Sequence, residues 1–71
     1  SHSVDTKYEQ QQLYLAIGSL SRQEQAVVLL FYMEDKSVKE IEVITGMPSG
    51  TVRSHLSRAR VHLRQFLEGL G

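Results

Sequence analysis

The sequence predicts an all-α fold, namely one four-helix domain with a C-terminal helix-turn-helix and no wing. Apolar residues recur at helical spacing, most regularly between Val52 and Leu70. Two Ser-x-x-Glu segments, which begin at Ser21 and Ser37, have the pattern of capping boxes at helix starts. No segment has the alternation and turn residues of a β-hairpin, and 71 residues suffice for a single domain.

The first helix is expected over residues 5–19, and residues 1–4 are expected to be a cloning remnant or disordered. Its apolar stripe has imperfect spacing and consists of Tyr8, Leu13, Ile17 and Leu20. The capping box of Ser21 with Glu24 starts a second helix over residues 22–33. Because residues 26–32 are apolar almost all round, this second helix is predicted to be the most buried one.

The third helix is expected over residues 38–45, with its inward face formed by Val38, Ile41 and Ile44, joined by Thr45. Gly46 can adopt the left-handed conformation that ends a helix. Pro48 prevents the helix from continuing, and Ser49 is the expected N-cap of a fourth helix over residues 50–68. The apolar stripe of this helix has spacings of four and three, and its members are Val52, Leu56, Ala59, Leu63, Phe66 and Leu70.

The net charge of zero conceals an asymmetry between the two parts of the chain. Residues 1–45 contain four basic and seven acidic side chains, whereas residues 46–71 contain four arginines against Glu68 alone. A basic second part favours an anionic partner such as DNA. The chain has no cysteine, no apolar run long enough to cross a membrane, no nucleophile–base pair and no phosphate loop. We therefore expect no enzymatic activity, no metal site, no cofactor and no membrane insertion.

The third and fourth helices are separated by a turn of about three residues, the spacing of a helix-turn-helix whose second helix enters the DNA major groove. Opposite the apolar stripe, the first two turns of the fourth helix expose short polar side chains and arginines. Arginine and serine are residue types that reach guanine edges and phosphates. The exposed set is Thr51, Arg53, Ser54, Ser57 and Arg58.

Three segments carry a resemblance to a known family: Leu20–Glu24, Ser37–Ile41 and, most specifically, Pro48–Arg60 with the sequence PSGTVRSHLSRAR. Together they resemble the C-terminal, promoter-reading domain of bacterial sigma factors, that is, region 4 of the extracytoplasmic-function group. The resemblance covers residues 10 to 67. Members of that group also carry a region 2 domain, so the resemblance implies that this chain is a fragment of a larger protein.

The resemblance implies recognition of the promoter −35 element, as double-stranded DNA, by a protein bound to RNA polymerase core in the bacterial cytoplasm. By position, it assigns base contacts to Arg53, Ser54 and Arg58. Contacts with the DNA backbone are expected from Ser49, Gly50, Thr51, His55, Ser57 and Arg60. The polymerase beta flap or an anti-sigma factor is expected to contact Leu13, Ile17, Leu29 and Leu30.

The chain departs from the family pattern at three places. Glu42 and Val43 stand where alanine and a polar residue are usual, Thr45 stands for leucine, and His55 stands for arginine. Two other functions therefore stay open. One is the output domain of a LuxR-type transcription regulator, which shares the pattern of residues 51–56. The other is an interaction module that binds no DNA and titrates an anti-sigma factor, a hypothesis favoured by the zero net charge.

Overall fold

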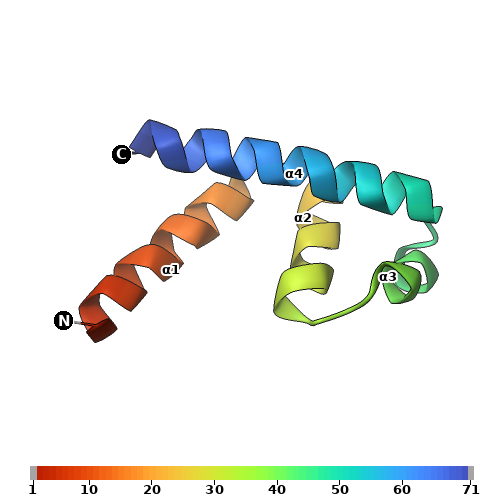
Figure 1. The fold of residues 1–71 in the computed structure, drawn as a ribbon, viewed down its shortest axis with the longest axis horizontal. Helices are drawn as coiled ribbons and strands as arrows, with labels where there is room; N and C mark the ends of the chain where they lie inside the picture. Colours follow the sequence, from red (N-terminus) through yellow and green to blue (C-terminus); the bar gives the residue numbers. More distant parts are fainter. Residues whose placement is uncertain (1, 71) are drawn as a thin grey trace.

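The computed structural model describes the backbone of residues 2–70 and the side chains of residues 7–69. Its elements are α1 (His2–Gly18), α2 (Arg22–Val28), the π-helical turn η1 (Leu29–Met33), α3 (Val38–Thr45) and α4 (Ser49–Leu70). Helix α4 runs along the length of the molecule, and the other helices lie on one side of it (Figure 1). Helix α1 meets α4 at the C-terminal end of α1 and diverges from it toward the N-terminus (Figure 1). The all-α prediction is thus confirmed for the described residues, within which no helix has the length and hydropathy of a membrane span.

Helix α1 begins at His2, earlier than the expected start at residue 5. It therefore includes residues 2–4, which the sequence assigned to a remnant; the side chains of residues 1–6 lie outside the described part of the chain. The helix ends in a tight turn, where the hydroxyl of Ser19 donates a hydrogen bond to the carbonyl of Ala16 at 2.6 Å. The side chain of Gln25 then joins α2 to this turn by donating to the carbonyl of Ile17 at 3.0 Å.

Both predicted capping boxes are confirmed. The hydroxyl of Ser21 accepts from the backbone N–H of Glu24, whose carboxylate accepts in return from the N–H of Ser21. Ser37 and Glu40 make the same reciprocal pair of hydrogen bonds at the start of α3. Each box satisfies backbone donors that the first helical turn leaves without a partner, which explains why both helices begin where the sequence predicts.

The second helical segment ends in a π turn, which the sequence analysis did not anticipate. The backbone N–H of Glu34 donates to the carbonyl of Leu29, five residues earlier, at 3.0 Å. A π turn holds more residues than an α turn, so it changes the direction in which the following side chains point. The prediction that this segment is the most buried is correct for Val27 and Val28 but wrong for η1, whose Leu29, Tyr32 and Met33 are exposed.

The turn between α3 and α4 has the predicted left-handed glycine, with Gly46 at φ 77°. The hydroxyl of Thr45 donates to the carbonyl of Ile41 at 2.7 Å and accepts from the N–H of Met47 at 3.2 Å. Thr45 therefore ties the end of α3 to the turn, a role that leucine could not have. The carbonyl of Pro48 accepts the first bond of α4, so Pro48 rather than the expected Ser49 occupies the cap position.

The core lies where α2, α3 and the C-terminal end of α1 pack against α4. Its buried apolar residues are Ile17, Leu20, Val27, Val28, Ile41, Val52, Leu56 and Ala59. On α4 the predicted stripe is confirmed for Val52, Leu56 and Ala59, while Leu63 and Phe66 are half-buried and the side chain of Leu70 is outside the described residues. On α3, Ile41 is fully buried, but the prediction that Ile44 faces inward is wrong because 54% of it is exposed.

Candidate nucleic-acid interface

Helix α4 presents all three predicted base-contacting residues to solvent. Arg53, Ser54 and Arg58 are exposed, while Val52 and Leu56 between them are buried in the core. The same helix therefore has one side fixed against α2 and α3 and another side available to a partner. This division follows from the apolar spacing of four and three, since residues off that stripe point away from the core.

The residues predicted to contact the DNA backbone differ in their exposure to solvent. Gly50, Thr51, Ser57 and Arg60 are exposed. Ser49 is half-buried in the first turn of α4. His55 is also half-buried, and its Nδ1 is buried with no hydrogen-bond partner among the described residues. A DNA contact through Nδ1 of His55 would thus require the ring to move.

Successive residues of a helix are rotated by about 100°, so the exposed side of α4 divides into three strips. One flank of the apolar stripe carries Arg53, Ser57, Arg60 and Arg64. Ser54 points almost directly away from the core, and Arg58 lies between that direction and the flank opposite Arg53. The opposite flank carries His55 and His62. The arginines of α4 thus lie on one flank and on the outer surface, whereas the opposite flank carries histidines.

No acidic residue occurs on α4 before Glu68, near its C-terminal end. Among the side chains of residues 7–69, no arginine of α4 is within ion-pair distance of a carboxylate; the one recorded pair joins His62 to Glu24. Arginines without carboxylate partners keep their charge available for phosphates and base edges. The charge asymmetry seen in the sequence is therefore a positive surface on α4.

Arg60 has a partner that the sequence analysis missed. Its Nε donates a hydrogen bond to the hydroxyl of Tyr32 in η1 at 2.8 Å. The two residues are 28 positions apart in the chain, so no local pattern could indicate the contact. The bond lies at the surface and connects the arginine flank of α4 to the π turn.

A second missed contact lies on the histidine flank. Glu24 is 4% exposed, and its carboxylate lies 3.0 Å from Nδ1 of His62. Burial raises the pKa of Glu24, but the hydrogen bonds from His62 and from the N–H of Ser21, together with the nearby imidazoles of His62 and His55, outweigh burial and leave this pKa below its ordinary value. Within the described residues, no His, Asp and Glu side chains are grouped so as to hold a metal ion.

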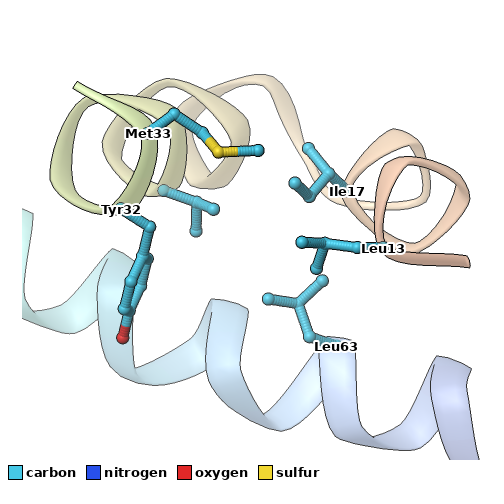
Figure 2. Close-up of a pocket in the computed structure, with 6 residues that line it drawn as sticks. Leu13, Ile17, Tyr32, Met33 and Leu63 are labelled. Atoms are coloured by element: carbon cyan, nitrogen blue, oxygen red, sulfur yellow. The ribbon is translucent and has the colours of Figure 1, made fainter. Parts of the chain in front are cut away.

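A pocket of about 220 Å³ lies between α1, η1 and α4, and its lining is apolar. Figure 2 shows Leu13 and Ile17 of α1 facing Tyr32 and Met33 of η1, with Leu63 of α4 forming the base. Val28 completes the lining. Of the predicted partner-contacting residues, Leu13 and Ile17 line this pocket. The other two do not: Leu29 is exposed, and Leu30 packs partly buried against the core.

Comparison with known proteins agrees with this geometry. Residues 10–63 match the protein family described as Sigma-70, region 4. The chain is also similar to the RNA polymerase sigma factor HrpL of Pseudomonas syringae pv. syringae, with 37% identity over 68 residues. That alignment covers 96% of this chain but only 37% of HrpL, so the chain spans little more than a third of the length of this relative. The matched family residues include all of α3 and the part of α4 that carries the arginines at 53, 58 and 60.

Proposed function

This chain belongs to the sigma-70 region 4 family, and on that premise we propose that it reads the −35 element of bacterial promoters as part of a longer sigma factor. One observation carries the proposal. The second helix of the helix-turn-helix, α4, has its apolar side fixed in the core and exposes Arg53 and Arg58 on its first three turns with no carboxylate partner.

This arrangement suits the major groove, whose width admits one α-helix. The N-terminal turns of the entering helix then face base edges, and its free N–H groups and partial positive charge favour a nearby phosphate. Arg53 and Arg58 have the planar donor pair that recognises the O6 and N7 acceptors of guanine. Gly50 and Thr51, exposed in the first turn of α4, are in the position to approach the sugar–phosphate backbone.

The experiment that tests this function begins with selection of bound duplexes from a random pool by the full chain. Fluorescence anisotropy then measures affinity for the selected duplex and for its single-base variants. We expect Arg53→Ala and Arg58→Ala each to lose about 1–3 kcal/mol of discrimination at one base pair. Arg64→Ala is the matched control: it removes the same charge from a position further along α4, so any loss should be equal for all duplexes.

Salt dependence gives an independent measure. If three to five phosphates are neutralised, the logarithm of affinity should fall with the logarithm of salt with a slope of roughly −3 to −5. A selection that yields no consensus, or no binding even at low salt, would contradict the proposal. The absence of binding even at low salt would instead favour a module that titrates an anti-sigma factor without contacting DNA.

We also propose that RNA polymerase core binds at the apolar pocket between α1, η1 and α4. The support is an open pocket of about 220 Å³ with an apolar lining, since such a surface can hold an apolar partner helix. Leu13, one of its lining residues, is 38% exposed. Arg53 and Arg58 do not line this pocket, so their DNA contacts could form while polymerase is bound; Tyr32, which lines it, is the partner of Arg60.

Binding of the isolated polymerase beta flap tests this partner. We expect Leu13→Asp to abolish measurable binding in a calorimetric titration, because a carboxylate would be desolvated against apolar side chains. Val43→Asp is the control, since Val43 is 81% exposed on α3, away from the pocket. Failure of the unmodified chain to bind the flap, with DNA binding intact, would favour a LuxR-type regulator.

A further inference from the structure

We propose that Tyr32 is a positioning residue for DNA binding, because its hydroxyl holds Arg60 in the orientation in which this arginine meets a phosphate. The inference rests on the proposed DNA-binding function and adds to it a residue that lies outside the helix-turn-helix. Tyr32 belongs to η1, whereas α3 and α4 form the DNA-reading unit.

The hydrogen bond between Arg60 and Tyr32 can orient the arginine side chain. Nε of Arg60 donates to the hydroxyl of Tyr32 at 2.8 Å. A guanidinium group has five N–H donors, and this bond uses only the one nearest the side-chain stem. The bond therefore restrains the stem and the plane of the fork and does not use the terminal amino groups. Arg60 shares its flank of α4 with Arg53 and Ser57, so the fixed fork belongs to the positive surface.

The tyrosine ring is itself held in place. Phe31 packs edge-on against it, with ring centroids 4.9 Å apart and an interplanar angle of 81°. The ring also forms a wall of the apolar pocket together with Met33 and Leu63. Figure 2 shows the ring extending from η1 to α4 with its hydroxyl at the far end. The π turn sets this direction, and such turns are often found at functional sites.

The hydroxyl has no role in the pocket wall, which is otherwise apolar and needs only the ring. Its recorded partner is Arg60. A long arginine side chain loses rotamer freedom when it binds a phosphate, and a side chain already ordered in the free protein loses less. Tyr32 therefore contributes to affinity by ordering Arg60 before DNA arrives, without touching DNA itself.

A double-mutant cycle on the full chain tests this role. Anisotropy measures affinity of the unmodified chain, Tyr32→Phe, Arg60→Ala and the double variant for the selected duplex and for an unrelated duplex. We expect Tyr32→Phe to weaken binding about three- to tenfold on both duplexes, a change within the lower part of the coupling found between contacting residues. In the Arg60→Ala background the same change should have no effect, because the group it positions is gone.

The control is Tyr14→Phe, which removes a tyrosine hydroxyl from a residue that is 62% exposed on α1 and should leave affinity unchanged. Urea unfolding of Tyr32→Phe shows whether the fold is intact. The proposal is overturned if Tyr32→Phe binds like the unmodified chain, or if it weakens binding equally in both backgrounds. If the unmodified chain binds no duplex, the proposed function itself fails, and that result is distinct from either of these.

Discussion

The carboxylate of Glu24 lies 3.0 Å from Nδ1 of His62 and joins the start of α2 to α4 across 38 positions of the chain. The contact between Tyr32 and Arg60 joins the end of the same helical segment to α4. Residues two positions apart on a helix are about 200° apart around its axis, so Arg60 and His62 lie on opposite flanks of α4. One polar contact on each flank opposes rotation of α4 about its axis, and the apolar stripe between them supplies the packing. The direction of Arg53 and Arg58 depends on that rotation.

Replacement of Glu24 by glutamine should lower the free energy of unfolding by about 1–3 kcal/mol at neutral pH, because the hydrogen bond to a buried carboxylate becomes a weaker one to a neutral amide. The change keeps the side-chain shape, and glutamine still completes a capping box. Urea denaturation measures the loss. Glu40→Gln is the matched control, since Glu40 has the same role in an exposed capping box without a histidine. Equal losses for the two variants would show that the contact with His62 adds no stability.

Stability should fall when the solution becomes acidic. The pKa of Glu24 in the folded chain is below its ordinary value of 4.5, because the hydrogen bonds and imidazoles around it outweigh burial. The folded state therefore resists protonation more than the unfolded state does. The stabilisation is complete above pH 4.5 and is lost as the pH falls through the lower, folded-state pKa. The melting temperature, measured between neutral and acidic pH, should fall less steeply with decreasing pH for Glu24→Gln than for the unmodified chain. An equal fall for both would contradict the assignment of this acid sensitivity to Glu24.

Two glycines of the helix-turn-helix should respond to alanine with opposite signs. Gly46 has φ 77°, which costs an alanine roughly 1–2 kcal/mol, so Gly46→Ala should destabilise the chain by about that amount. Gly50 lies within α4, where an added Cβ meets no atom within 4 Å, so Gly50→Ala should stabilise the chain by about 0.5–1 kcal/mol. Urea unfolding of both variants checks the signs, and a loss at Gly50 would show that its backbone departs from regular helix.

The sequence could predict those features of the fold that depend on residues close together in the chain. A capping box needs two residues three positions apart, and a left-handed turn needs a glycine, so the starts of α2 and α3 and the turn at Gly46 could be predicted. The same holds for the division of α4 into a buried stripe and an exposed arginine side. Each of these features depends on neighbours within about one helical turn.

Features that depend on distant residues could not be predicted in this way. The contacts of Glu24 with His62 and of Arg60 with Tyr32 depend on how the second helical segment crosses α4. The π turn places Leu29, Tyr32 and Met33 at the surface, although their apolar run indicated burial. His55, read as a DNA-facing residue, is half-buried on the flank near Glu24. Periodicity gives the direction of a side chain on its own helix, but it does not give the partner that the direction meets.

Two isoleucines of α3 differ in burial and can be compared within one helix. Ile41 is fully buried and Ile44 is 54% exposed, although both belong to the face that the sequence predicted as buried. Ile41→Val should cost about 0.5–1.5 kcal/mol, because it removes one methylene from a packed site that can collapse only partly. Ile44→Val removes the same group from a site open to solvent, so its effect should stay within about 0.5 kcal/mol. Urea unfolding of the two variants under identical conditions measures the difference. If Ile44→Val proved as costly as Ile41→Val, α3 would be rotated in solution so that Ile44 packs inward, and the exposed surface of the helix-turn-helix would have to be reassigned.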